Sequence, residues 1–185
     1  MFEILLGRLA SALKKAKIDY MVIGGQAVLI HGEPRYTKDI DVTLGVDTDK
    51  LPELIKLSKG LGLRVLVKKP EEFVRDTKVL PAIQISSNIK VDFIFSSAEF
   101  EREAIKRAKS VKIGRTAIKF ASLEDLVILK IIAGRPRDIE DVRILLIKNP
   151  RHGVEYIRAW LRKFDAALDA DYSRAFANIL NEINH

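Results

Sequence analysis

The segment that most constrains the fold of this chain is residues 39–45, Asp-Ile-Asp-Val-Thr-Leu-Gly, in which polar and apolar side chains alternate strictly. Successive residues of a β-strand point to opposite faces of the sheet. The alternation therefore predicts a strand with one apolar face in a hydrophobic core. The opposite face carries two carboxylates, Asp39 and Asp41.

Two carboxylates side by side on one strand face repel each other unless water or a cation separates them. Mg²⁺ in proteins is commonly held by one or two carboxylates together with waters and phosphate oxygens. The alternative is a solvent-facing acidic strand, because an Asp-x-Asp motif by itself is common. The motif alone leaves both interpretations open.

Hydrophobic periodicity predicts an α+β fold, with a mixed, helix-flanked sheet in the first two-thirds of the chain and helices in the last third. Residues 70–78 are polar and are predicted to form a loop or one helical turn. Asn149-Pro150 is the best weak boundary, which predicts one domain over 1–149 and a helical extension over 150–185 packed on it. The predicted strands are 20–23, 39–45, 63–67, 79–86, 90–96, 111–113 and 116–120, and the predicted helices are 2–17, 26–31, 50–61, 97–108, 122–133, 138–148, 152–164 and 171–183.

Composition excludes several classes of protein. The chain has no cysteine, so disulfides, thiolate metal sites and cysteine nucleophiles are excluded. No apolar run reaches the roughly 18–20 residues of a membrane span, and the N-terminus lacks the features of a signal peptide. We therefore expect a cytoplasmic protein without membrane contact. The net charge of +7 favours polyanionic partners such as nucleotides or RNA, although a charged, thermostable surface would explain it equally.

Two further features belong with the aspartate pair. Gly24 and Gly25 follow a short apolar strand and precede a predicted helix, where glycines let backbone N–H groups approach an anion or satisfy a tight turn. Asp92 interrupts the apolar strand 91–95, and a carboxylate there is unfavourable unless it is paired, half-exposed or metal-bound. Together these residues suit metal-assisted phosphoryl transfer.

The order of these motifs resembles the polymerase-β-type nucleotidyltransferase superfamily. That pattern has a small Gly-Gly or Gly-Ser turn, an Asp-x-Asp or Asp-x-Glu pair and a third acid on a neighbouring strand. The segments Ile23-Gly-Gly-Gln-Ala27 and Arg35-Tyr-Thr-Lys-Asp-Ile-Asp41 are similar to the minimal nucleotidyltransferases of the AbiEii toxin type. Residues 122–126, Lys130 and residues 137–142 are similar to the helical segment of that group.

The resemblance implies a nucleotidyltransferase-like domain over residues 1–149. Asp39, Asp41 and Asp92 would be its catalytic and metal-binding residues, with Mg²⁺ or Mn²⁺ as the cofactor. The expected reaction moves a nucleoside monophosphate from an NTP to a hydroxyl of RNA, a protein or a small molecule. A toxin-like role and an antitoxin partner are implied only by this resemblance.

The resemblance also implies nucleotide-binding residues. Gly24 and Gly25 would hold the phosphates, and Arg35, Lys38 and Lys130 are candidate cationic contacts. The alternative for Arg35 and Lys38 is ordinary solvated charge. The alternative for Lys130 is an ammonium group that reaches solvent from a mostly apolar helix.

Two other functions stay open. The glycine turn lacks the serine that many members of the superfamily use for phosphate, so the chain could be an inactive nucleotidyltransferase fold that binds nucleotide, RNA or a protein. A glycosyltransferase could use Asp-x-Asp to hold a metal-bound sugar nucleotide. A glycosyltransferase would not account for the glycine turn and Asp92 together.

Overall fold

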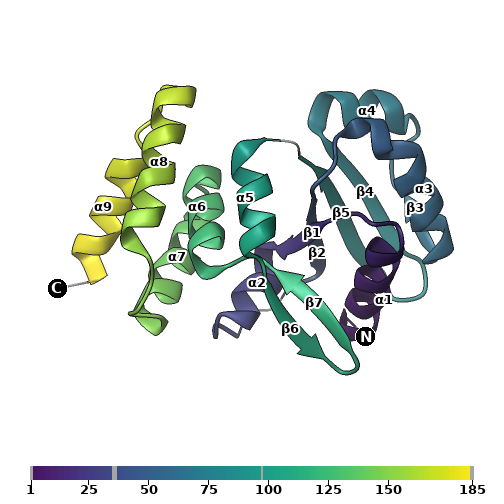
Figure 1. Cartoon of the computed structure of the whole chain (residues 1–185), viewed down its shortest axis with the longest axis horizontal. Helices are drawn as coiled ribbons and strands as arrows, with labels where there is room; N and C mark the ends of the chain where they lie inside the picture. The colour runs from purple at the N-terminus through teal and green to yellow at the C-terminus, as the bar shows by residue number, and fades with distance from the viewer. Residues whose placement is uncertain (1, 35–36, 97, 184–185) are drawn as a thin grey trace. The chain divides into compact units, whose positions relative to one another are not determined.

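The computed structural model of the chain describes residues 2–34, 37–96 and 98–183 (Figure 1). The elements are α1 (Phe2–Lys15), β1 (Tyr20–Ile23), α2 (Gly24–Ile30), β2 (Asp39–Leu44), the 3₁₀ helix η1 (Thr48–Lys50), α3 (Leu51–Gly60), β3 (Leu63–Val65), α4 (Pro70–Thr77), β4 (Val79–Gln84), β5 (Ile89–Phe95), α5 (Glu99–Arg107), β6 (Lys109–Ile113), β7 (Thr116–Phe120), α6 (Leu123–Ala133), α7 (Pro136–Lys148), α8 (Val154–Leu168) and α9 (Tyr172–Ile183).

Seven strands form one mixed sheet in the order β3-β4-β5-β2-β1-β7-β6. Strands β2 and β5 are parallel, as are β1 and β7, and the remaining neighbours are antiparallel. The predicted α+β fold is therefore confirmed, and the predicted strands agree with the observed ones to within a few residues. The central pair β2–β5 brings together two strands whose sequences each carry aspartate.

The prediction for the polar segment before β4 was wrong. Residues 70–78 were expected to form a loop or one helical turn, but Pro70–Thr77 form the two-turn helix α4. Pro70 occupies the first turn, where a missing N–H removes no hydrogen bond, and the Val74 side chain is fully buried. Lys78 ends the helix in the left-handed conformation with φ 60°. A single buried apolar residue is too weak a periodic signal to distinguish such a helix from a loop.

The chain divides into two compact units. The first comprises Met1–Ala27 and Tyr36–Ala121, which contains the whole sheet, and the second comprises Val28–Arg35 and Ser122–His185. This division falls near residue 122, and the separate extension expected from residue 150 stays a prediction.

Each unit has an apolar core. In the first, α1 packs against β7 through a stripe that includes Leu5, Leu9 and Leu13, and the β2 residues Ile40 and Val42 are buried. In the second, α6 contacts α7, α8 and α9. Among residues 2–34, 37–96 and 98–183, none of the helices combines the length and hydrophobicity that a membrane span requires.

Candidate active site

Strand pairing places the three aspartates on one face of the sheet. Asp41 of β2 and Asp92 of β5 are direct partners in the parallel pair, and Asp39 precedes Asp41 by two residues. Neighbouring strands lie about 4.8 Å apart, and directly paired residues point to the same face. All three side chains are partly exposed, whereas Ile40, between the first two, is fully buried. We call Asp39, Asp41 and Asp92 the aspartate face.

A lysine that the sequence analysis did not select lies on the same face. Lys90 is the direct partner of Asp39 in the parallel pair, and it is exposed. Its positive charge lowers the pKa of Asp92. The signal was present in the sequence, because Lys90 precedes Asp92 by two positions and must share its face if this segment is a strand.

Asp92 is the electrostatically least favourable member of the aspartate face. Burial raises the pKa of its carboxyl group, the negative charge of Asp39 raises it further, and Lys90 partly opposes both effects. An elevated pKa means that the folded protein binds the proton of Asp92 more tightly than the unfolded chain does. Ionised Asp92 therefore destabilises the fold above that pKa, and a cation bound between the carboxylates would relieve the repulsion.

The substitution Asp92→Asn is therefore expected to raise the thermal unfolding midpoint at neutral pH in metal-free buffer. The gain over wild type should shrink as pH falls through the raised pKa of Asp92, because the wild-type carboxyl becomes neutral as well. Circular dichroism melts with a chelator, at neutral pH and near pH 4, measure both effects. Asp76→Asn, at an exposed position of α4, is the matched control. A variant no more stable than wild type at neutral pH would contradict this account.

The turn after β1 is built around Asp41. Gly24 has φ +64°, and a Cβ atom there would lie 2.0 Å from Oδ2 of Asp41. Any side chain at this position would displace the carboxylate, so glycine is required both by the backbone and by the aspartate. A Cβ on Gly25 would lie 2.8 Å from Oγ1 of Thr37. Glycine at this position therefore leaves room for the Thr37 side chain, which lies just before β2. The tight-turn interpretation therefore holds at Gly24, and the turn directly adjoins the aspartate face.

The aspartate face provides only part of a coordination shell. Within the part of the chain that the structure describes, no three His, Asp or Glu side chains form a group that could hold a metal ion. Mg²⁺ and Mn²⁺ favour carboxylate oxygens, and Mg²⁺ usually keeps waters or takes oxygens from a substrate phosphate. The hard oxygen donors and the mutual repulsion of Asp39 and Asp92 fit such an ion, with the remaining ligands supplied by nucleotide and water.

The candidate cations differ in what the structure says of them. Lys38 directly precedes β2 and is exposed. Arg35 lies outside the described residues. Lys130 lies on α6, in the second unit, and its polar contacts with Asp138 and Asp141 are made there.

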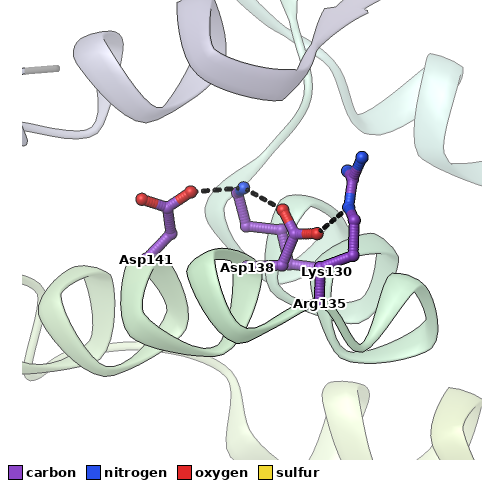
Figure 2. Close-up of polar contacts among 4 residues, drawn as sticks. All are labelled: Lys130, Arg135, Asp138 and Asp141. Carbon is purple, nitrogen blue, oxygen red and sulfur yellow. Dashed lines mark hydrogen bonds and ion pairs between the residues drawn. The ribbon is translucent and has the colours of Figure 1, made fainter. Parts of the chain in front are cut away.

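Lys130 is the centre of an ionic network in which the lysine and two aspartates are buried (Figure 2). Its Nζ lies 2.9 Å from Oδ1 of Asp138 and 2.6 Å from Oδ2 of Asp141, both on α7. The Lys130 side chain is only 6% exposed, so the alternative interpretation, an ammonium group that reaches solvent, is wrong. Arg135, between the two helices, donates from Nε to Oδ2 of Asp138. The network joins α6 to α7.

Asp138 depends on its two cationic partners. Burial alone raises the pKa of its carboxyl, but hydrogen bonds from Arg135 and Lys130 outweigh burial and hold the pKa below its usual range. Its contribution to stability is present above the pKa of an unfolded aspartate. It is lost as pH falls through the lower pKa of the folded state.

The substitution Lys130→Met is expected to destabilise the second unit by about 3 kcal/mol, because it leaves two buried carboxylates without their shared cation. Trp160 on α8, the only tryptophan of the chain, reports unfolding of this unit in urea by its fluorescence. Lys148→Met is the control, since Lys148 pairs with Glu33 in the same unit but is 42% exposed. The control should lose less than about 1 kcal/mol, and equal losses would refute the buried network.

Solved structures with the same fold include two adenylyltransferases. The antibiotic-resistance factor ANT(2'')-Ia in solution has a TM-score of 0.63 and 19% identity, covering 90% of this chain and 94% of that chain. Its crystal structure in complex with adenylyl-2''-tobramycin has a TM-score of 0.60 and 18% identity, covering 90% and 98%. The lincosamide antibiotic adenylyltransferase LnuA with bound lincomycin has a TM-score of 0.53 and 15% identity, covering 76% and 94%. At these identities the likeness concerns the fold.

The family is shown by a match to the sequence rather than to the structure. No curated protein matches it. A family profile does match, over residues 5–161, which include β1, the glycine turn, the aspartate face and helices α6 and α7. The AbiEii subtype stays a prediction. The chain belongs to the family described as nucleotidyltransferase of unknown function (DUF6036).

Proposed function

We propose that the chain transfers a nucleoside monophosphate from an NTP to a hydroxyl acceptor and releases pyrophosphate, with Mg²⁺ or Mn²⁺ as the cofactor. The observation that supports this most strongly is the register of β2 and β5, which pairs Asp41 with Asp92 and sets Asp39 on the same face. The contact between Gly24 and Asp41 adds the turn that would admit the phosphates beside that face.

The three carboxylates would have two different roles. Asp39 and Asp41 would hold the divalent ion, which supplies charge neutralisation of the phosphates when bound. Asp92 would accept the proton of the acceptor hydroxyl, and its raised pKa makes it a stronger base than an ordinary aspartate. The hydroxyl oxygen then forms a bond to the α-phosphorus, and the bond from that phosphorus to the bridging oxygen breaks.

The other site residues would position the nucleotide. Backbone N–H groups after Gly24 and Gly25 would face the phosphates at the start of α2. Lys38 and Lys90 would offset the charge of the triphosphate beside the aspartate face. A triphosphate contact by Lys130 stays a prediction, and its buried ion pairs support a structural role in the second unit.

We further propose a small-molecule hydroxyl as the acceptor. The structural neighbours include ANT(2'')-Ia, solved with adenylyl-2''-tobramycin, and LnuA, solved with lincomycin, and both cover most of this chain. RNA and protein acceptors, the toxin role and an antitoxin partner stay predictions that the same assay can test. A fold that binds nucleotide without transferring it is the alternative outcome.

The test is incubation of the purified chain with α-labelled NTPs, Mg²⁺ or Mn²⁺, and a panel of aminoglycosides, lincosamides, RNA and proteins. Transfer of label with stoichiometric pyrophosphate release would support the proposal and identify the acceptor. An Asp39→Ala/Asp41→Ala double variant controls for contaminating activity. Equal labelling by wild type and double variant would overturn the proposal, and nucleotide binding without transfer to any acceptor would favour the inactive alternative.

A further inference from the structure

A basic pocket lies in the first unit, at the end of β1 that is remote from the aspartate face. It has a volume of about 440 Å³ and is formed by the end of α1, the following turn, the start of β1 and the β6–β7 hairpin. Its lining residues include Lys14, Lys17, Asp19, Tyr20, Ser110 and Lys119. We call this the lysine pocket.

The lysine pocket is separate from the aspartate face. Along the antiparallel pair of β1 and β2, Ile23 is the partner of Asp41, whereas Tyr20 is the partner of Leu44. Three residues of strand place Tyr20 about 10 Å from the row that contains Asp41. A ligand in the lysine pocket would therefore not occupy the site of the proposed transfer reaction.

The charges of the lysine pocket favour an anion. The charged lining residues are three lysines and one aspartate, Asp19. Lys119 forms an ion pair with Asp19 at 3.2 Å, and the two side chains are 43% and 75% exposed. Such exposed pairs are worth little, so Lys119 can turn toward a ligand. Within the described residues, the ammonium groups of Lys14 and Lys17 make no hydrogen bond or ion pair.

The end of helix α1 explains only part of this arrangement. A lysine in the last turn, such as Lys14, is favoured by the helix dipole in any protein. Lys17 lies beyond the helix, with φ 55°, and Lys119 comes from β7. The convergence of three lysines from separate elements on one pocket is therefore not a consequence of helix capping.

Tyr20 adds a buried hydrogen-bond donor to the lysine pocket. The residue is only 5% exposed, and its hydroxyl oxygen accepts a hydrogen bond from the backbone N–H of Lys119 at 3.3 Å. No acceptor for the hydroxyl proton exists among the residues that the structure describes. Burial raises the pKa of Tyr20, with the Lys119 hydrogen bond partly opposing it, so the hydroxyl keeps its proton at neutral pH.

We propose that the lysine pocket binds a phosphate group, carried by a nucleotide or by the backbone of a nucleic acid. Lys14, Lys17 and Lys119 would neutralise the phosphate, and the Tyr20 hydroxyl would donate a hydrogen bond to it. The apolar lining residues Ala10, Ile18 and Ala117 leave room for a sugar or a base beside the charged end. This site is independent of the proposed transfer reaction and needs no metal.

Backbone amide NMR shifts of the full chain, with a chelator present to exclude divalent ions, test the proposal. The probes are inorganic phosphate, AMP and a single-stranded RNA oligonucleotide, each titrated to about 10 mM or to saturation. The amides of Lys119 and Ser110 should shift with a saturable response. Binding at least about ten-fold tighter to RNA than to AMP, falling steeply with salt, assigns the phosphate to a nucleic acid. Similar affinities for both assign it to a nucleotide.

Variants connect the shifts to the lysine pocket. Lys14→Gln/Lys17→Gln should weaken binding by about ten-fold or more, and Tyr20→Phe should weaken it by about five-fold while the fold is kept. Lys56→Gln/Lys59→Gln, at exposed positions of α3, removes the same charge outside the pocket and should leave the affinity within about two-fold. Absence of shifts with every probe, or equal weakening by both lysine pairs, would overturn the proposal.

Discussion

Replacing Asp41 with asparagine is expected to lower the rate of nucleotidyl transfer by about 10³-fold or more while the protein stays folded. Asparagine keeps the size of the side chain but removes the charge that would hold the divalent ion beside Asp39. A 10³-fold loss corresponds to about 4 kcal/mol of transition-state stabilisation, which is within the range of a metal ligand. Asp41 is partly exposed and is not one of the buried core residues, so the fold should tolerate an asparagine of nearly the same size.

The measurement is the initial rate of pyrophosphate release with the acceptor found in the labelling assay. Binding of Mn²⁺ by calorimetry, with and without nucleotide, separates loss of the metal from loss of the nucleotide. Asp76→Asn, at an exposed position of α4 that pairs with Arg75, should keep the wild-type rate. A rate for Asp41→Asn within about two-fold of wild type would remove Asp41 from the active site.

The shared face of Asp39 and Asp41 could be predicted from the sequence, because the alternation of side chains along a strand depends only on neighbouring residues. Once residues 39–45 are a strand, Asp39 and Asp41 must share a face, and the same rule joins Lys90 to Asp92. The pairing of Asp41 with Asp92 required the register of two strands that are about 50 positions apart in the chain. Only the resemblance to a known family indicated that they meet, because periodicity does not specify which strands are neighbours.

In the second unit, the helices could be predicted from the sequence, but the contacts between their charged side chains could not. Helices α6 and α7 were expected from periodicity and from their Gly and Pro boundaries. The contacts of Lys130 with Asp138 and Asp141 depend on how α7 folds back along α6. A lysine in an apolar helix can reach solvent or pair with a buried acid, and the sequence alone does not distinguish these outcomes. Helix α4 was missed because a single fully buried valine anchors it.

The largest effect expected from a residue without a functional group is that of Gly24→Ala. The added methyl would lie 2.0 Å from Oδ2 of Asp41, so the carboxylate must move by more than an ångström to reach ordinary contact. Displacement of a catalytic group by about 1 Å lowers a rate by roughly 10²-fold. The positive φ of 64° adds a backbone penalty of about 1–2 kcal/mol to folding, because L-residues with side chains disfavour that region.

Gly62→Ala is a matched control for the backbone penalty. Gly62 lies in the same unit with φ +74°, and nothing lies within 4 Å of the position of its Cβ atom. Both variants should lose similar stability in thermal melts, whereas only Gly24→Ala should lose activity at temperatures where both are folded. Equal activities of the two variants would show that the geometry of Asp41 does not limit the reaction.

A double-variant cycle then tests whether the glycine acts through the aspartate. If Gly24→Ala lowers activity by displacing the Asp41 carboxylate, it should have little further effect once Asp41→Asn has removed the charged oxygen. Independent roles predict losses that multiply, to about 10⁵-fold in the double variant. A double variant no worse than Asp41→Asn alone would identify the glycine turn as the element that positions this carboxylate. Multiplied losses would instead indicate that Gly24 contacts the substrate directly.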